Sequence, residues 1–211
     1  IQEIDQLIQQ GRGKKVCETI QAAMDEGISA ADILREGMLP AMSAIGEKFK
    51  NNEVFVPEVL VAARAMNMGM ALLKPYMADC GIEPAGTAVI GTVRGDMHDI
   101  GKNLVKIMLE GSNIEVYDLG ADVAPETFIQ AAREHHCDII ACSALLTTTM
   151  QQMRQVVELA RESGIRDRVY IMVGGAPISQ SFCDEIHADL YTPDAASAAR
   201  AAVDRLTHPA K

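Results

Sequence analysis

Two side chains that could carry chemistry, Asp96 and His98, lie two residues apart in the stretch Arg94-Gly-Asp-Met-His-Asp-Ile-Gly101. In an extended segment this spacing puts both side chains on one face. A carboxylate beside an imidazole can hold one ring N–H, which leaves the other ring nitrogen free to bind a metal or take a proton. Gly101 closes the stretch and permits a ligand or backbone to approach closely. An isolated Asp-x-His pair more often has a structural role, so the surrounding elements must decide.

The surrounding pattern is a strand, a polar turn and a helix. An apolar run at 87–93 precedes the stretch and a helical pattern at 102–110 follows it, which is the context in which α/β proteins bind ligands. After Gly101 come 41 residues and then Ser143-Ala-Leu145, and 28 residues later comes Gly174-Gly175. Each of these segments ends an apolar, strand-like run. We therefore predict that three strands of one sheet end at the same edge and form a slot there.

These three segments carry a family resemblance. Asp-x-His-x-x-Gly at 96–101, Ser-x-Leu at 143–145 and Gly174-Gly175 together resemble the cobalamin-binding signature of methionine synthase, carbon-skeleton mutases and corrinoid proteins. Residues 143–150 look most like the small corrinoid proteins of methylamine, methanol and betaine methyltransferase systems. Residues 49–59 and 63–66 are similar to the helical cap domain of that group. The resemblance covers nearly the whole chain and extends to the cap and cobalamin-binding modules of methionine synthase.

The resemblance implies cobalamin as the cofactor, a cobalt corrinoid that also occurs as methylcobalamin, bound with its nucleotide base displaced from the metal. It makes His98 the axial cobalt ligand, with Asp96 fixing the ring tautomer and raising its basicity. Thr149 matches the hydroxyl residue that completes a relay with these two. The other residues of this region expected to contact the cofactor are Met97, Asp99, Gly101 and Leu145.

The nucleotide tail would then occupy a channel into the sheet. Ser143 would offer its hydroxyl to the buried base, because a buried polar atom without a partner costs about 1–3 kcal/mol. Thr147 would line the channel, and Gly174 and Gly175 would leave room where a Cβ would collide. On the other side of the corrin, the resemblance places Phe55 and Val59 over the upper face. Phe55 could instead be a hydrophobic staple ahead of the helix that starts at Pro57.

Composition limits the other possibilities. The 211 residues are 48% hydrophobic but only 4% aromatic, with a formal net charge of −10 and no Lys/Arg block, so we expect no nucleic-acid partner. The five cysteines show no C-x-x-C spacing, which argues against a disulfide framework or a zinc site. No 18-residue apolar run and no signal peptide are evident, so we expect a cytoplasmic protein without membrane contact.

The periodicity predicts two domains, a helical cap at 1–83 and a cobalamin-binding domain at 84–211. Up to about residue 81, apolar stripes at helical spacing indicate four helices in an up-and-down bundle. Ser29 and Asp32 resemble a capping box at the start of the third helix, and Pro40 should kink it. Residues 79–86 are the expected linker.

The second half changes its period. Strand-like runs alternate with helix-like runs and predict a doubly wound, five-stranded parallel sheet of the flavodoxin/Rossmann-like kind. The expected strands are 87–93, 114–119, 138–144, 168–173 and 189–192. The expected helices are 101–111, 125–136, 149–163, 179–187 and 194–206.

The resemblance implies a methyl carrier. Cobalt(I) would accept a methyl group from a substrate-specific methyltransferase, and methylcobalt(III) would donate it to a second methyltransferase that acts on tetrahydrofolate or a thiol. A reductive activase would be a further partner. Because the chain is too short to contain either catalytic barrel, we expect a carrier subunit, not an enzyme that turns over alone.

Three alternatives stay open at this point. A cobalamin-binding sensor module would need an output domain, which the acidic helices do not supply. The small subunit of a cobalamin-dependent mutase would not need cap helices. A hydrolase with Asp96, His98 and Asp99 as metal ligands would leave Ser143 and Gly174-Gly175 unexplained. The methyl donor and the acceptor are not identified by any of these residues.

Overall fold

Residues 1–79 and 83–208 are described by the computed structural model of the chain, in which the centre of the expected linker, including Cys80, lies outside the described residues. The chain divides into two compact units. The helical unit comprises Ile1–Pro84 with Gly111–Asn113, and the α/β unit comprises Ala85–Glu110 with Ile114–Lys211.

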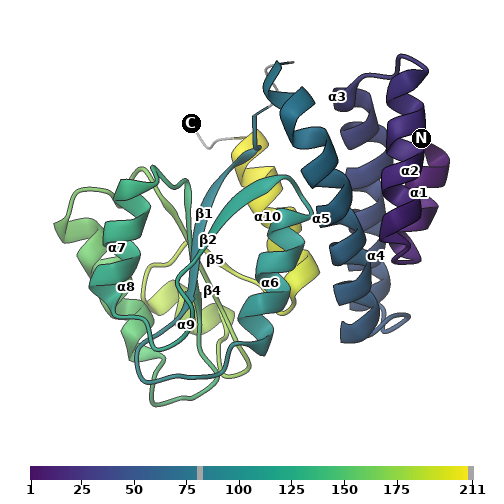
Figure 1. The fold of residues 1–211 in the computed structure, drawn as a ribbon. Coiled ribbons are helices and arrows are strands. Elements are labelled where there is room, and N and C mark those ends of the chain that lie inside the picture. Colours follow the sequence, from purple (N-terminus) through teal and green to yellow (C-terminus); the bar gives the residue numbers. More distant parts are fainter. Residues whose placement is uncertain (80–82, 209–211) are drawn as a thin grey trace. The chain divides into compact units, whose positions relative to one another are not determined.

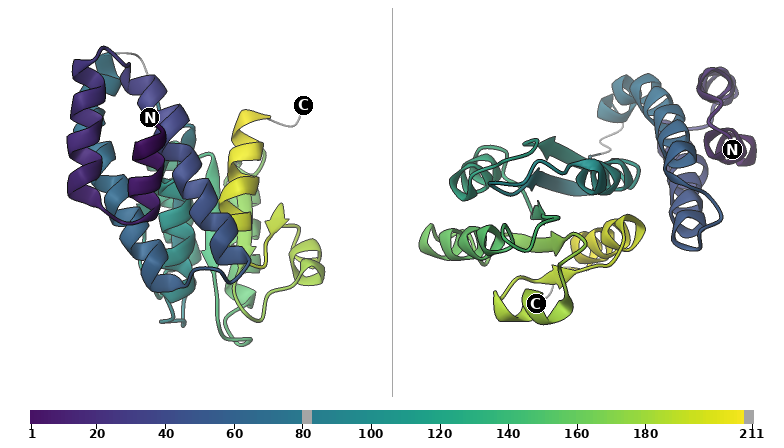
Figure 2. Two further views of the ribbon diagram at one scale, coloured as in Figure 1. Left: turned by 90° about the vertical axis from the view of Figure 1, so that its right-hand side faces the viewer. Right: turned by 90° about the horizontal axis from the view of Figure 1, so that it is seen from below.

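The helical unit contains four helical segments that lie alongside one another (Figure 2). The third is interrupted, because α3, the π-helical turn η1 and α4 follow one another without a break. The elements are α1 (Gln2–Gln9), α2 (Gly13–Asp25), α3 (Ala30–Asp32), η1 (Ile33–Met38), α4 (Leu39–Lys50) and α5 (Val56–Asp79). Their apolar stripes meet in a core that includes the fully buried Ile8, Ile20, Leu34 and Met66. The predicted four-helix arrangement is confirmed.

Local sequence explains the third helical segment. The Ser29 hydroxyl accepts a hydrogen bond from the Asp32 backbone N–H at 3.1 Å and donates to the Asp32 carboxylate at 2.7 Å, so the predicted cap is present. The π-helical turn Ile33–Met38 lies directly ahead of Pro40. Proline has no N–H, and its ring clashes with the carbonyl of the residue four positions earlier. The π-helical turn therefore includes Glu36, the residue whose carbonyl would clash with the Pro40 ring in an α-helix.

Helix α5 includes a stretch, Val56–Met77, that is long and apolar enough to cross a membrane by length and composition alone. The core helix of a bundle has the same composition, because one face is buried. In α5 the residues Ala62, Met66 and Leu73 are buried at helical spacing. A Cβ built on Gly69 would contact Ile20 of α2. Packing inside the helical unit thus explains the buried face of α5, whereas Leu60, Val61 and Tyr76 of the same helix are exposed.

The α/β unit is a five-stranded sheet whose strand pairs are all parallel, in the order β2-β1-β3-β4-β5 (Figure 1). The strands are β1 (Gly86–Thr92), β2 (Ile114–Asp118), β3 (Ile139–Ser143), β4 (Tyr170–Gly174) and β5 (Leu190–Tyr191). The helices are α6 (Ile100–Glu110), α7 (Pro125–Glu134), α8 (Gln151–Glu162), α9 (Gln180–Glu185) and α10 (Ala195–Thr207). Helices α6 and α10 pack together, and α7 and α8 cover the opposite face (Figure 1). The predicted doubly wound sheet is confirmed.

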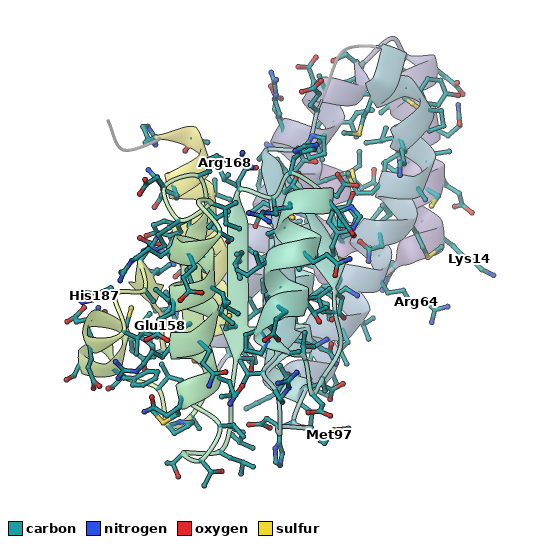
Figure 3. All side chains as sticks on the ribbon, turned by 90° about the vertical axis from the view of Figure 1, so that its left-hand side faces the viewer. Lys14, Arg64, Met97, Glu158, Arg168 and His187 are labelled. Carbon is teal, nitrogen blue, oxygen red and sulfur yellow. The ribbon has the colours of Figure 1, made fainter. Side chains whose placement is uncertain are left out.

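The register of the sheet positions the expected slot. Thr92, the last residue of β1, pairs with Ser143, the last residue of β3. Ser143 in turn pairs with Gly174, the last residue of β4. Three neighbouring strands therefore end level with one another, so the loops that follow them start from one edge. Met97, which follows β1, and Arg168, which precedes β4, accordingly lie at opposite ends of the α/β unit (Figure 3).

Candidate cofactor-binding site

The turn after β1 is tied to the sheet at both of its ends. The Asp96 backbone N–H donates to the Val93 carbonyl at 3.1 Å, which closes the turn. The fully buried Thr92 donates from its hydroxyl to the His98 carbonyl at 3.0 Å. These two bonds define the path of the segment that carries Asp96 and His98, before α6 starts at Ile100.

The Asp96 carboxylate is fully buried and accepts five hydrogen bonds. One oxygen accepts from the His98 backbone N–H at 3.0 Å and from its ring Nδ1 at 2.7 Å. The other accepts from the backbone N–H groups of Leu145 and Leu146, at 2.7 and 3.1 Å, and from the Thr149 hydroxyl at 2.9 Å. Burial alone would raise the pKa of Asp96, but the bonds from Leu145 and His98, with that from Leu146, outweigh it and hold the pKa well below its ordinary value.

The state of the His98 ring follows from this carboxylate. Since Asp96 is ionised, the contact at Nδ1 requires Nδ1 to carry the proton. A neutral ring then keeps its lone pair on Nε2, the nitrogen that a metal would bind. The His98 side chain is 52% exposed, so Nε2 belongs to a side chain that a ligand can reach. The expected Asp96–His98 pair is therefore present, with a tautomer suited to coordination.

Thr149 joins the pair from the loop after β3. Its hydroxyl is buried and lies 2.9 Å from the Asp96 carboxylate and 2.9 Å from the Leu146 carbonyl. One hydroxyl proton cannot serve both acceptors at once. Thr149 can thus donate to Asp96 or turn to Leu146, so the number of donors on the carboxylate can change by one without moving the backbone.

The glycines at the site differ in how much space surrounds the position of a Cβ. A Cβ built on Gly101 would meet no heavy atom within 4 Å among the described residues, although Gly101 lies in the first turn of α6. A Cβ on Gly174 would come no nearer than 4.0 Å, to the Thr192 carbonyl oxygen. The chain therefore leaves room at Gly174, and a collision between a Cβ there and a nucleotide tail stays a prediction.

Gly175 has a structural reason to be glycine. Its φ is +131°, and a Cβ there would overlap the carbonyl of Ala144, the residue after β3. The close approach between the ends of β3 and β4 thus requires glycine by itself. A role in accommodating a cofactor tail is additional to this packing role and is not needed to explain the residue.

The remaining expected residues of the α/β unit line the same edge. The Ser143 side chain is partly buried at the end of β3. Thr147 and Asp99 are exposed. Met97 is 71% exposed and projects from the loop after β1 (Figure 3). Leu145 is also exposed.

Two apolar neighbours were missed by the sequence analysis. Ile100 and Leu146 are exposed large hydrophobic residues, as are Met97 and Leu145. Met97 and Ile100 lie within two residues of His98 in the sequence, and Leu145 and Leu146 supply two of the backbone N–H groups that bind Asp96. Large exposed apolar side chains that gather at one place indicate a binding surface. An apolar rim, an accessible imidazole and an open position at Gly101 fit a flat macrocycle with a metal at its centre.

Phe55 and Val59, both in the helical unit, differ in exposure to solvent. Phe55 is 61% exposed, and its backbone N–H donates to the Glu58 carboxylate at 3.1 Å. A hydrophobic staple packs against the helix that follows it, whereas most of the Phe55 side chain is exposed to solvent. Val59 is fully buried. Val59 lies on the same stripe of α5 as the core residues Ala62 and Met66. That Val59 covers a corrin face stays a prediction.

A buried lysine in the first turn of α6 forms an ion pair with the end of β2. Lys102 is 2% exposed, and its ammonium group donates to Asp118 at the end of β2. A buried lysine is tolerated only with such a partner. Asp118 also accepts from the Gly120 backbone N–H at 2.9 Å, and the Gly120 carbonyl accepts from the Thr92 N–H at 2.9 Å. Lys102, Thr92 and Asp118 went unnoticed in the sequence because their partners are distant along the chain.

The arrangement disfavours the metal-hydrolase alternative. Both oxygens of Asp96 already accept hydrogen bonds from the protein, so the carboxylate is a partner of His98 and not a metal ligand. Across the part of the chain that the structure describes, no group of three His, Cys, Asp or Glu side chains could hold a metal ion. His98 alone could supply a protein ligand, which suits a metal that arrives inside a macrocycle.

Comparisons with known proteins agree with this chemistry. Residues 86–203 match a family described as the B12 binding domain, and residues 1–74 match a second family with the same description. Trimethylamine corrinoid protein 1 of Methanosarcina acetivorans is 46% identical over 82% of this chain and 82% of its own length. Dimethylamine corrinoid protein 2 of the same organism is 39% identical over 98% of this chain and 95% of its own length.

A solved structure shares the fold. The methanol:cobalamin methyltransferase complex of Methanosarcina barkeri contains a chain that superposes with a TM-score of 0.86 at 28% identity, covering 99% of this chain and 80% of that one. Fold and site thus define a cobalamin-binding protein with an N-terminal helical module. The chain belongs to the corrinoid proteins of methylamine and methanol methyltransferase systems.

Proposed function

We propose that this chain is a methyl carrier that binds one cobalamin through His98 and passes methyl groups between two separate methyltransferases. The observation that carries the proposal is the Asp96–His98 pair, in which a buried carboxylate holds Nδ1 at 2.7 Å and leaves Nε2 for cobalt. When bound, the corrin supplies a cobalt centre that can accept a methyl group and give it up again. The chain's own part is to bind this group, orient it and protect it.

Each site residue has a proposed task. His98 is the axial ligand, Asp96 holds its tautomer, and Thr149 adjusts the hydrogen bonds on Asp96. Ser143, which ends β3 level with the ends of β1 and β4, receives the displaced nucleotide base. Further contacts to the macrocycle or its tail come from Met97, Asp99, Gly101, Leu145, Thr147, Gly174 and Gly175.

The helical module has a separate proposed role. We assign residues 1–83 to a cap domain and 84–211 to the cobalamin-binding domain. Phe55 is the cap residue proposed to shield the upper corrin face, because it is a large apolar side chain left 61% exposed. Val59, one helical turn further along α5, is proposed to support Phe55 in this role. Shielding must be reversible, since each methyltransferase has to reach the metal.

The partners follow from the carrier role. A substrate-specific methyltransferase delivers the methyl group, and a second methyltransferase passes it to tetrahydrofolate or a thiol. A reductive activase restores the reduced metal. The chain by itself turns nothing over, and its place is the cytoplasm. Among the relatives, the named substrates are trimethylamine and dimethylamine, so methylamine methyltransferases are the first donors to test.

The test combines binding and transfer. The purified chain should take up one cobalamin, and the cobalt(II) form should show nitrogen hyperfine splitting that changes when the histidines carry ¹⁵N. His98→Ala should abolish that splitting, whereas His187→Ala, at the turn between α9 and β5, should not. Loaded parent protein should then accept methyl groups from a methylamine methyltransferase in vitro. Splitting that persists in His98→Ala and still responds to ¹⁵N-labelled histidine would refute the assignment of the ligand.

A further inference from the structure

Asp122, in the loop between β2 and α7, contacts the segment that carries Asp96 in two places. Its carboxylate accepts a hydrogen bond from the Gly95 backbone N–H at 2.7 Å. Its own backbone N–H donates to the Asp96 carbonyl at 3.0 Å. The two bonds run in opposite directions and enclose Gly95 and Asp96. Asp122 thereby fixes both ends of the residue pair that precedes the exposed Met97.

The backbone at this contact is unusual on both sides. Asp122 has φ +56° and Gly95 has φ +83°, so both residues are in the left-handed region. Glycine adopts this region freely, whereas an aspartate there is held by its surroundings. The loop is held on its other flank, where the Val123 N–H donates to the Thr92 carbonyl at 2.9 Å. A glycine at 122 could make the same left-handed turn, but it could not accept a hydrogen bond from the Gly95 N–H.

Asp122 affects the position of His98 through the backbone of Asp96. The direction of the Asp96 side chain depends on the orientation of the backbone around it. Asp122 contacts the peptide that follows Asp96, at the Asp96 carbonyl, and the peptide that precedes Gly95, at the Gly95 N–H. Correct orientation lets the carboxylate meet Leu145, Leu146 and Thr149 on one oxygen and His98 on the other. We infer that Asp122 is a positioning residue that presents the Asp96–His98 pair to the lower face of the corrin. This inference rests on the proposed function and adds a residue to it.

Three substitutions separate the carboxylate from the turn. Asp122→Asn keeps a side-chain oxygen for the Gly95 N–H and is the conservative rescue. Asp122→Gly removes the acceptor but suits the positive φ, so the fold should be as stable as in the parent or more so. Asp122→Ala removes the acceptor and leaves the strain. His187→Gly is the matched control, because His187 also has a positive φ, of +58°, at a turn that contains no proposed site residue.

The first readout needs no cofactor. In the cobalamin-free protein, amide hydrogen exchange at Gly95 should accelerate in Asp122→Gly and Asp122→Ala and stay near the parent rate in Asp122→Asn. The melting temperature of Asp122→Gly should not fall. An unchanged Gly95 exchange rate in Asp122→Gly would overturn the inference, whatever the protein binds.

The second readout uses hydroxocobalamin as the probe, reduced to cobalt(II) after binding. In Asp122→Gly the dissociation constant should rise roughly ten-fold, the lower end of the effect of losing an outer-shell partner. The fraction of cobalt that shows histidine nitrogen splitting should fall with it. His187→Gly and Asp122→Asn should behave like the parent. Parent-like splitting in Asp122→Gly would refute the positioning role alone, whereas absence of splitting in the parent would refute the proposed function as well.

Discussion

Replacing Asp96 by asparagine tests the core of the site, because the amide has the shape of the carboxylate but only one acceptor oxygen. Three donors converge on one carboxylate oxygen, from Leu145, Leu146 and Thr149, so the amide oxygen should face them. The NH₂ group then faces the His98 backbone N–H and Nδ1, which both donate in the parent. The ring can resolve this conflict by moving its proton to Nε2.

The size of the effect can be worked out from these bonds. The tautomer with a proton on Nε2 cannot coordinate cobalt, and loss of a partner that orients a metal ligand typically weakens binding by about 10- to 100-fold, or roughly 1.4–2.8 kcal/mol. The backbone N–H of His98 also loses a bond to a charged acceptor, which costs about 1.5–3 kcal/mol. We therefore expect Asp96→Asn to weaken cobalamin binding and to destabilise the cofactor-free protein.

The destabilisation should depend on pH in a defined direction. The pKa of Asp96 is depressed from its ordinary value of 3.8. A carboxylate with a depressed pKa contributes stability above its unfolded-state pKa and loses it as the pH falls toward the folded-state value. The difference in unfolding free energy between parent and Asp96→Asn should thus be complete at pH 7 and should shrink as the pH falls below about 4.

The assay is a spectrophotometric titration with hydroxocobalamin, together with urea unfolding of the cofactor-free protein at several pH values. Asp138→Asn is the matched control, because Asp138 accepts from the Thr87 N–H at 2.9 Å at the opposite end of the sheet, where an amide oxygen can replace it. Cobalamin binding by Asp96→Asn with parental affinity and with histidine nitrogen splitting intact would show that the tautomer argument is wrong.

Three further predictions concern single residues. Gly101→Ala adds a Cβ at a position with no neighbour within 4 Å in the described chain, so unfolding titrations should show the cofactor-free protein stabilised by about 0.5–1 kcal/mol. Binding titrations should show a higher dissociation constant for cobalamin, and unchanged binding would remove Gly101 from the site. Ser143→Ala removes one hydroxyl from a partly buried side chain, so it should change the melting temperature little. It should weaken binding of cobalamin but not of cobinamide, which lacks the nucleotide tail, and equal weakening of both would contradict a role in tail binding. Phe55→Ala should leave the melting temperature unchanged, since the side chain is mostly exposed, and should speed photolysis of protein-bound methylcobalamin. An unchanged photolysis rate combined with a lower melting temperature would show that Phe55 is a hydrophobic staple instead.

Much of the fold was predictable from local pattern. Apolar residues at helical spacing in α1, α2 and α5 identify buried faces, and the alternation of strand and helix after Thr87 leaves few topologies. The ends of the strands were also predictable from the sequence, because polar or small residues follow each apolar run. Sheet order then brought Thr92, Ser143 and Gly174 level, as expected for parallel strands that share one edge.

Other features required the folded chain, because they depend on partners far apart in sequence. Five donors surround Asp96, and three of them come from residues 145–149, about fifty positions away, in a loop whose register is fixed by β1 and β3. The burial of Val59 depends on which face of α5 meets its own bundle, and the need for glycine at 175 depends on the approach of Ala144. The sequence determined which residues could do the chemistry, since residue type and spacing are local properties. The tertiary structure decided their hydrogen-bond partners and exposure, because those are set by the packing of segments that the sequence keeps apart.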